Sequence, residues 1–302
     1  MNRRVAAIDF GTNTARLLIV DRSGNRLEPL CLDREIVRMG GGFCRKRGLS
    51  PEAWERGLSC LKRFATRIGQ IGGCHDIRAV ATSAVRDACN GADFVEAVRR
   101  ETGICLEVID GIREGALTLK GVLAGLDEPH DEIVLFDVGG GSTEYTLART
   151  GEAVFIRSLP LGVVRLTEGK GEPAAMRDKI RRELAGLQSQ LDRAGCLCTR
   201  DAVLIGTAGT ATTLAAICLG LREYDHRLVN NAVVSRDQIE AVYERLLPMA
   251  PAERLQVPGL EKGREDLIIA GILITLETME MTGQGCLKVS DYGLLEGLVV
   301  SG

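Results

Sequence analysis

Apolar and polar positions follow two different periods along this chain. Short apolar runs such as VAAIDF (5–10) and EIVLFDVG (132–139) are typical of buried β-strands. In other stretches apolar residues recur at spacings of three and four, which predicts amphipathic helices, most clearly over 50–72 and 173–194. Ser235 with a glutamine three residues later is a capping box, which predicts a further helix start.

The order of these elements predicts the fold class. Strands and helices alternate through the first part of the chain, and the same alternation then begins again, which indicates an α/β protein with a largely parallel inner sheet. A length of 302 residues favours two domains over one. We expect a first domain of residues 1–120 plus 290–302, and a second domain of residues 121–289.

An internal repeat supports that division. The stretch DFGTNTARLLI, which begins at Asp9, can be laid over DVGGGSTEYTL, which begins at Asp137, with a constant offset of 128 residues. The leading acid, the following glycine and a hydroxyl side chain match in the two stretches. Each follows an apolar strand and precedes an alternating one, so the chain is expected to contain two related halves.

The residue types in these turns suit a phosphate and a cation. Glycines let backbone N–H groups approach an anion closely. Carboxylates would repel a phosphate unless a cation lay between them. The candidate phosphate donors are Gly11, Thr12 and Asn13 in the first turn and Gly139, Gly140, Gly141, Ser142 and Thr143 in the second. The candidate metal ligands are Asp137 and Glu144, with Asp9 sharing that role. The alternative is a tight hairpin turn in which Asp9 hydrogen-bonds its own turn.

Composition excludes several classes of protein. The formal net charge of −3 argues against bulk nucleic-acid binding. No run of about 18 apolar residues is present, and the N-terminal apolar run is short and ends in Asp9, so we expect neither a membrane span nor a signal peptide. The ten cysteines form no C-x-x-C pair, which argues against a structural zinc site and favours reduced thiols in a cytoplasmic protein.

Eight motifs, taken together, resemble one family. The chain is similar from end to end to the exopolyphosphatase/guanosine pentaphosphate phosphatase (Ppx/GppA) family, in its short two-domain form. The motifs are AAIDFGTNTARLLI, ATSAVRDACN, VIDGIREGA, DVGGGSTEY, SLPLGVVRLTE, GTAGTATTLAAI, VPGLEKGREDLIIAGILI and VSDYGLLEGLV. The resemblance implies the actin–hexokinase–chaperone ATPase superfold, with two related ribonuclease H-like α/β domains facing a cleft between them.

The resemblance also implies an activity. It is hydrolysis of a terminal phosphoanhydride of inorganic polyphosphate or guanosine pentaphosphate with Mg²⁺ or Mn²⁺. The family's catalytic base falls on Glu114 and a phosphate-binding arginine falls on Arg86. Asp110, Gly115 and Leu295 depart from the family pattern, the last replacing an arginine.

Other interpretations stay open at this point. Glu114 could be a first-turn glutamate that stabilises a helix N-terminus, and CRKRG (44–48) could be a solvated charge run or a contact for a polyanion. An ATP-dependent kinase of the same superfold and a non-catalytic alarmone or polyphosphate sensor are the competing functions. We expect a polyanionic phosphate substrate and no nucleic-acid or membrane partner, and the sequence is compatible with a homodimer.

Overall fold

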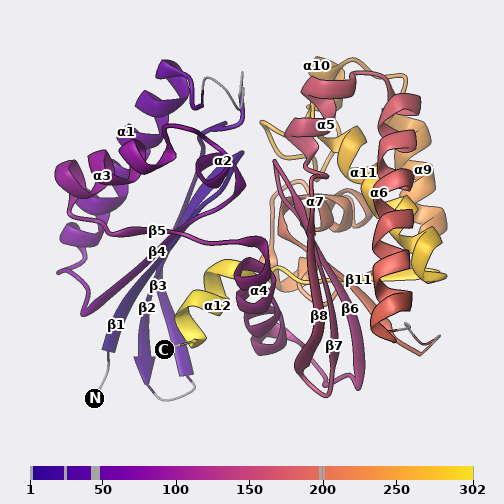
Figure 1. Cartoon of the computed structure of the whole chain (residues 1–302), viewed down its shortest axis with the longest axis horizontal. Coiled ribbons are helices and arrows are strands. Elements are labelled where there is room, and N and C mark those ends of the chain that lie inside the picture. Colours follow the sequence, from indigo (N-terminus) through magenta and orange to yellow (C-terminus); the bar gives the residue numbers. More distant parts are fainter. Residues whose placement is uncertain (1–2, 24–25, 42–47, 197–198, 200, 302) are drawn as a thin grey trace. The chain divides into compact units, whose positions relative to one another are not determined.

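The computed structural model describes residues 3–23, 26–41, 48–196, 199 and 201–301. The chain divides into two compact units. Unit 1 comprises Met1–Gly121 with Leu294–Gly302, and unit 2 comprises Val122–Gly293. Each unit has its own β-sheet with helices packed on it (Figure 1). Each unit is therefore described by itself.

Unit 1 is built on a five-stranded sheet in the order β3-β2-β1-β4-β5. The strands β1, β4 and β5 run parallel, whereas β2 and β3 form an antiparallel meander with β1. The strands are β1 (Arg3–Phe10), β2 (Thr14–Ser23), β3 (Arg26–Ile36), β4 (Asp76–Ala81) and β5 (Leu106–Val108). The helices are α1 (Pro51–Gln70), α2 (Ser83–Arg86), α3 (Gly91–Thr102), α4 (Gly111–Gly125), whose last residues belong to unit 2, and α12 (Leu294–Val300).

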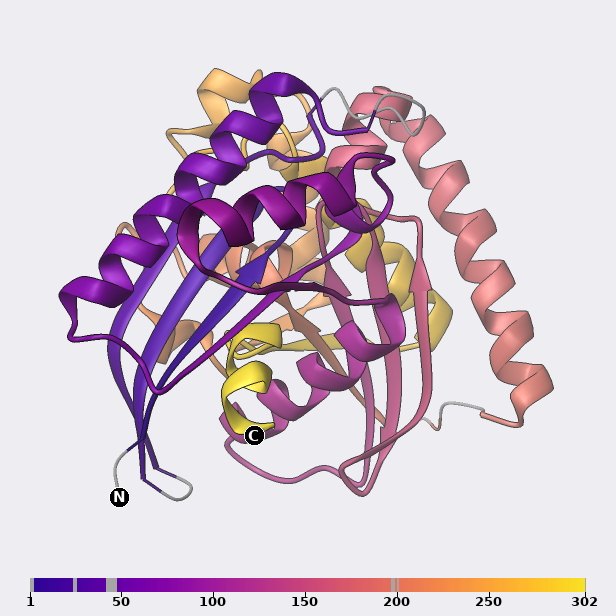
Figure 2. The ribbon, with the colours of Figure 1, turned by 60° about the vertical axis from the view of Figure 1, so that its left-hand side comes forward.

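Residues 5–8 of strand β1 are all apolar because both faces of the sheet are covered there. Side chains alternate between the two faces of a strand. Ile8 and Phe10 pack into the cluster that includes α1 and α3, which lie over one face in Figure 2. Val5 and Ala7 pack into a second cluster with α12. A run that is buried on both faces shows no apolar–polar alternation, as the sequence of β1 shows.

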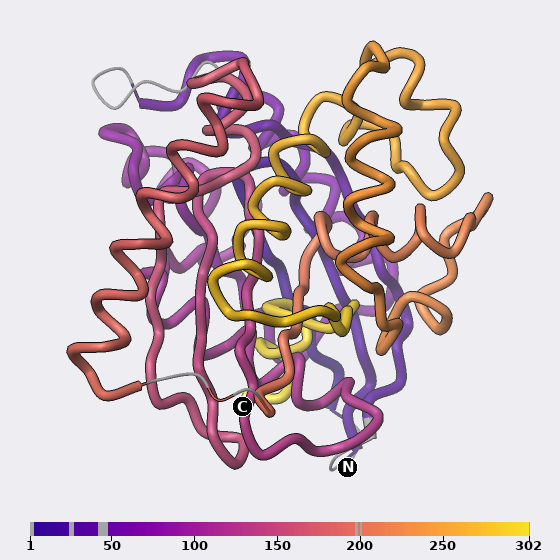
Figure 3. The backbone as a smooth tube through the Cα atoms, turned by 90° about the vertical axis from the view of Figure 1, so that its right-hand side faces the viewer, coloured from indigo at the N-terminus to yellow at the C-terminus, as the bar shows by residue number. Residues whose placement is uncertain are grey.

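Unit 2 is built on a six-stranded sheet in the order β10-β11-β9-β6-β7-β8. Helix α11 packs between α6 and α9 (Figure 3). The strands are β6 (Glu132–Val138), β7 (Thr143–Arg149), β8 (Glu152–Leu159), β9 (Val203–Thr207), β10 (Val233–Ser235) and β11 (Cys286–Val289). The helices are α5 (Val163–Lys170), α6 (Pro173–Ala194), α7 (Ala208–Cys218), α8 (His226–Val229), α9 (Arg236–Leu246), α10 (Pro251–Arg254) and α11 (Ile268–Thr282).

The two sheets share one topology, which confirms the predicted repeat. In both, the first three strands form an antiparallel meander, and two further strands add in parallel beyond the first strand. Strands β6, β7, β8, β9 and β11 correspond in this way to β1, β2, β3, β4 and β5. Strand β10 is an addition at the edge of unit 2, where it pairs antiparallel with β11.

Local signals placed several helix ends correctly. Helix α6 spans the predicted residues 173–194, and Ser235 forms the predicted capping box at the start of α9, accepting a hydrogen bond from the Gln238 N–H at 3.2 Å. The elements α5, α8, α10 and β10 were not predicted, because at three to eight residues each they are too short to show a clear period. In the described part of the chain, no helix combines the length and the apolar character needed to span a bilayer.

The cysteines of the described segments are free thiols. Burial raises the pKa of the Cys60 thiol, and it raises the pKa of the Cys218 thiol to about 11. Both groups are therefore protonated near neutral pH and behave as small apolar side chains.

Substitution of two helical glycines by alanine is expected to change the free energy of unfolding in opposite directions. A Cβ atom at Gly297 in α12 would lie 1.9 Å from the carbonyl oxygen of Leu117 in α4, whereas a Cβ atom at Gly186 in α6 would meet nothing within 4 Å. Gly297→Ala should therefore destabilise unit 1 by about 1–3 kcal/mol through overpacking. Gly186→Ala should stabilise unit 2 by up to about 1 kcal/mol through helix propensity. Thermal unfolding midpoints measure both effects, and a stable Gly297→Ala variant would contradict close packing of α12 on α4.

Candidate functional site

In unit 1, the predicted site residues gather at one edge of the sheet. Strands β1, β4 and β5 are parallel, so their carboxyl ends lie at the same edge. The turn 11–13 follows β1, α2 follows β4, and α4 begins shortly after β5. In α/β sheets this edge is where ligands bind.

Glu114 lies in the first turn of α4 and its exposed fraction is 7%. The carboxylate of Asp110 accepts a hydrogen bond from the backbone N–H of Arg113 at 2.8 Å, and the Asp110 carbonyl accepts one from the N–H of Glu114 at 2.9 Å. Asp110 is thus the N-cap of the helix that carries Glu114. Asp is a favourable N-cap residue, so this departure from the family pattern leaves the position of Glu114 supported.

Arg86 at the end of α2 is directed to Glu114. Its Nη1 donates to the carbonyl oxygen of Ile109 at 2.8 Å and lies 3.3 Å from Glu114 Oε2. The two residues are 28 positions apart in the sequence, and the fold brings them together. The guanidinium of Arg86 therefore fixes the position of the Glu114 carboxylate from one side.

The first turn is held by hydrogen bonds within unit 1. The buried hydroxyls of Thr12 and Ser83 lie 2.7 Å apart, and the N–H of Gly11 donates to the Thr14 carbonyl at 3.1 Å. The side-chain oxygen of Asn13 is buried and accepts no hydrogen bond from the described residues, which points to a bound group or a water molecule. Ser83 was missed in the sequence, although it lies in the ATSAVR motif.

The two repeated turns differ in charge. In the β1–β2 ladder Asp9 lies opposite Arg16, whose Nη2 is 2.8 Å from Asp9 Oδ2. In the β6–β7 ladder Asp137 lies opposite Glu144. Arg16 and Glu144 are separated by the repeat offset, so an arginine in the first turn corresponds to an acid in the second. Asp9 therefore forms an ion pair with an arginine of the neighbouring strand. This contact resembles the alternative from the sequence, in which the Asp9 carboxylate hydrogen-bonds within its own turn.

Asp137 and Glu144 are arranged in a way that suits a cation. Their exposed fractions are 8% and 2%, and Glu144 Oε1 accepts a hydrogen bond from the hydroxyl of Ser158 at 2.7 Å. Residues directly opposite in an antiparallel ladder point to the same face, with Cβ atoms about 4.5–5.5 Å apart. Two buried carboxylates at that spacing repel each other, and a divalent cation bound by both would relieve the repulsion.

The glycine turn of unit 2 is fixed by the segment that leads into α5. The carbonyl oxygen of Gly139 accepts a hydrogen bond from the N–H of Val163, and that of Gly140 accepts one from the N–H of Val164, both at 3.0 Å. The hydroxyl of Thr143 donates to the Leu161 carbonyl. Thr143 is fully buried and its hydroxyl proton is used within the unit, so the structure does not support a direct contact of this hydroxyl with a phosphate, and that role stays a prediction.

A different acidic cluster also has metal-ligating groups. Asp127, Glu128 and His130 could hold a metal ion, since one ligand atom from each lies within 4.8 Å of the others. The ammonium group of Lys288 lies 2.5 Å from Asp127 Oδ1. A positive charge is therefore already placed against this cluster, and none of its members was a predicted ligand.

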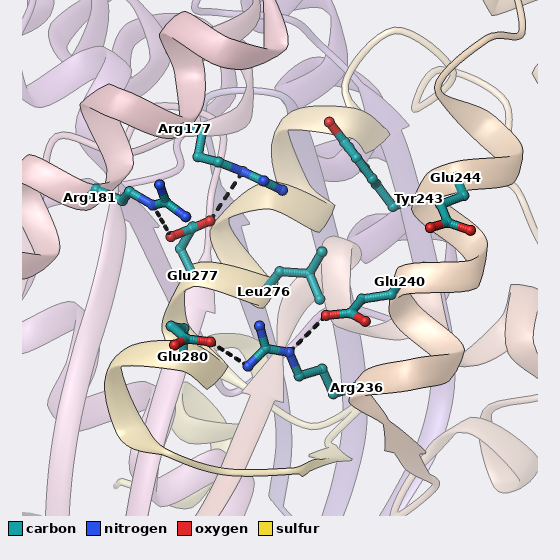
Figure 4. A pocket seen from close by; sticks show the side chains of 9 residues that line it. All are labelled: Arg177, Arg181, Arg236, Glu240, Tyr243, Glu244, Leu276, Glu277 and Glu280. Carbon is teal, nitrogen blue, oxygen red and sulfur yellow. Dashed lines mark hydrogen bonds and ion pairs between the residues drawn. The ribbon is translucent and has the colours of Figure 1, made fainter.

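A cavity of about 290 Å³ lies among α6, α9 and α11 (Figure 4). Most of its charged side chains pair with one another: Arg177 and Arg181 both contact Glu277, at 3.1 and 2.7 Å. Arg236 lies 2.8 Å from Glu240 and 2.5 Å from Glu280. None of the predicted site residues lines this cavity, and its ion pairs connect α11 with α6 and with α9.

Two remaining sequence features can be located. Leu295 is 1% exposed in the apolar cluster of α12, so the family arginine is replaced here by a core residue. The basic segment 44–48 lies outside the described residues apart from Gly48. Its predicted contact with a polyanion stays a prediction.

Comparison with known proteins places the chain among phosphatases. The model of the "Ppx/GppA phosphatase family" matches residues 18–302. The chain is 31% identical to Exopolyphosphatase 2 of Mycobacterium tuberculosis, over 99% of this chain and 98% of that protein. It is 30% identical to a bifunctional 3-dehydroquinate synthase/phosphatase of Fusobacterium nucleatum. That match includes 98% of this chain, which spans only 46% of the length of the bifunctional protein.

Solved structures agree with this match. A crystal structure of an exopolyphosphatase from Cytophaga hutchinsonii superimposes with a TM-score of 0.89 at 27% identity, covering 98% of this chain and 96% of that one. The Aquifex aeolicus Ppx/GppA family member gives a TM-score of 0.82 at 31% identity, covering 99% and 97%. The predicted fold class, two α/β units of the actin-like ATPase superfold, is thereby confirmed. With its sequence matched from residue 18 to the end and its fold shared, this chain belongs to the Ppx/GppA phosphatase family.

Proposed function

We propose that the protein is a phosphoanhydride hydrolase that releases terminal orthophosphate from inorganic polyphosphate. Guanosine pentaphosphate is the second candidate substrate, as the family name suggests. The observation that carries the proposal is Glu114, a buried carboxylate held against Arg86 at the edge of the sheet where parallel strands end. The relatives named exopolyphosphatases support the choice of polyphosphate.

Glu114 would act as the general base. A water molecule attacks the terminal phosphorus, Glu114 accepts the proton of that water, and the bond to the bridging oxygen breaks. The products are orthophosphate and a chain shortened by one phosphate. Arg86 would hold the carboxylate in place before the attack.

The backbone of the repeated turns would hold the phosphates. Asn13 and the N–H groups of Gly140, Gly141 and Ser142 are the proposed phosphate-binding groups, with Thr12 positioned through Ser83. The N–H groups of Gly11 and Gly139 donate to the carbonyls of Thr14 and Ser142, so these two glycines would serve by shaping the turns. Ser142 adds a hydroxyl. Asp137 and Glu144 would hold Mg²⁺ or Mn²⁺, which neutralises charge on the phosphoryl oxygens when bound. The paired Asp9 is a weaker candidate for that role.

The distribution of charge between the units fits a polyanion and a cation. In unit 1 lysine and arginine outnumber aspartate and glutamate by 20 to 16, whereas in unit 2 they are outnumbered by 18 to 25. A basic surface attracts an anionic chain, and an acidic one concentrates metal ions. The net charge of the whole chain conceals this difference.

Phosphate release tests the proposal directly. Purified protein is given long-chain polyphosphate, guanosine pentaphosphate or ATP, with Mg²⁺, with Mn²⁺ and with chelator. We expect release of orthophosphate from polyphosphate that depends on the cation. Transfer of phosphate from ATP to a hydroxyl compound would favour the kinase. Binding of the phosphate compounds without any release would favour the sensor.

A further inference from the structure

Three consecutive carbonyl groups in the glycine turn of unit 2 are held from one side. The carbonyls of Gly139 and Gly140 accept hydrogen bonds from backbone N–H groups of Val163 and Val164, and Gly140 also accepts one from the N–H of Arg165 at 3.2 Å. The carbonyl of Gly141 accepts a hydrogen bond from the Arg165 side chain, through Nε at 2.8 Å. All four hydrogen bonds therefore come from the first turn of α5.

These bonds orient the N–H groups of the turn. In a trans peptide the C=O and the following N–H point in opposite directions. The N–H groups of Gly140, Gly141 and Ser142 therefore point away from α5, and none of them donates to another group in the described part of the chain. Successive N–H groups on one side of a turn form an anion-binding nest.

The third peptide of this nest depends on a side chain. The first two carbonyls are held by the backbone of α5, which packs so closely that a Cβ at Gly162 would lie 2.2 Å from the Gly140 oxygen. Among the residues that the structure describes, only the guanidinium of Arg165 donates a hydrogen bond to the carbonyl of the peptide between Gly141 and Ser142. Glycine permits large backbone rotations, so without that contact this peptide can turn its carbonyl toward the phosphate.

The first turn achieves a similar arrangement with backbone groups alone. The carbonyl of Thr12 accepts a hydrogen bond from the N–H of Gly40, and that of Asn13 accepts hydrogen bonds from the N–H groups of Val37 and Arg38. The segment that follows the third strand thus restrains the turn in both repeats. In unit 2 this restraint includes one side chain, that of Arg165, which can be tested by substitution.

We propose that Arg165 is a positioning residue that holds the Gly141–Ser142 peptide so that the Ser142 N–H faces a substrate phosphate. This inference rests on the proposed function for the identity of the anion. Arg165 acts through the backbone of the turn and does not itself bind the substrate.

The test compares Arg165→Met, which removes the donor and the charge, with Arg165→Lys, which keeps a donor. Arg157→Ala, at an exposed position of β8, is the matched control for loss of one positive charge in unit 2. A hydrogen bond from a charged group is worth about 1.5–3 kcal/mol, so kcat/KM for polyphosphate should fall about 10- to 100-fold in Arg165→Met. Arg165→Lys should recover a large part of it, and Arg157→Ala should resemble wild type.

Two further measurements separate positioning from direct attraction. If Arg165 merely attracted the polyanion by its charge, the decrease in kcat/KM caused by its removal would disappear at high salt. The effect of a misplaced N–H group does not depend on salt in this way. We therefore expect the decrease in kcat/KM of Arg165→Met to remain at about 0.5 M salt. Amide hydrogen exchange over residues 139–145, measured without substrate, should become faster in Arg165→Met and stay unchanged in Arg157→Ala.

The outcomes are distinguishable. Wild-type exchange and wild-type kcat/KM in Arg165→Met would overturn the proposal, and so would a defect that vanishes at high salt. Faster exchange in Arg165→Met, together with a wild-type protein that neither binds nor hydrolyses polyphosphate, would leave the control of the turn supported and reject the proposed function instead.

Discussion

Glu114→Gln is expected to lower kcat for polyphosphate by about 10²- to 10⁴-fold, the usual contribution of a general base. Glutamine keeps the size of the side chain and can still accept a hydrogen bond from Arg86, 3.3 Å away in the structure. It cannot accept the proton of the attacking water. Steady-state phosphate release measures kcat, and polyphosphate binding and the thermal unfolding midpoint should stay close to wild type.

Glu107→Gln is the matched control for this variant. Glu107 lies on β5 and pairs with Arg113 one residue before Glu114, but its side chain is half exposed. Its loss should leave kcat within a few-fold of wild type. If Glu114→Gln hydrolyses polyphosphate as fast as Glu107→Gln does, Glu114 is only a helix N-terminal glutamate, and the base is another group.

Asp137→Asn is expected to remove most of the Mg²⁺-dependent turnover. The substitution removes one of the two buried carboxylates that face each other across β6 and β7, so the site loses affinity for a divalent cation. Groups that stabilise developing charge in the transition state are each worth about 10²–10³ in kcat. We expect a loss of that order at low millimolar Mg²⁺, partly recovered at high Mg²⁺, with phosphate release measured across a Mg²⁺ titration.

Substitutions of two other carboxylates serve as controls for the effect of Asp137→Asn. Asp131→Asn, just before β6, tests for a general effect of lost charge and should leave the Mg²⁺ titration unchanged. Asp9→Asn removes the partner of Arg16, and we expect it to change activity without moving the Mg²⁺ midpoint. An equal shift of the midpoint in Asp9→Asn and Asp137→Asn would mean that both turns hold the cation.

The sequence alone was sufficient for features that depend on neighbouring residues. The bounds of α6, the capping box at Ser235 and the strands on either side of each glycine turn follow from local periodicity and from cap chemistry. The repeat was also visible, because two turns with the same backbone need glycines at the same places. The shared topology of the two sheets confirms it.

The partners of the site side chains were decided by the tertiary structure. The sequence showed matching acids in the two turns, but the strand register places Asp9 opposite an arginine and Asp137 opposite a glutamate. Arg86 contacts Glu114 only because β4 and β5 are neighbours in the sheet. Such contacts depend on which strands pair and in what register, and a local pattern carries no information about either.

The tertiary structure also showed the partners of polar groups whose role could not be read from the residue type. The Thr143 hydroxyl was a candidate phosphate donor by type, yet its neighbour in space is the Leu161 carbonyl. Arg165 carried no signal beyond its motif, and its contact with Gly141 exists because α5 begins beneath the turn. A donor that is buried beside an unpaired carbonyl must satisfy it, since an unmade hydrogen bond there costs about 1–3 kcal/mol. Local sequence therefore determined the longer elements and the two turns of this protein, and packing determined which polar groups within them remain available to a ligand.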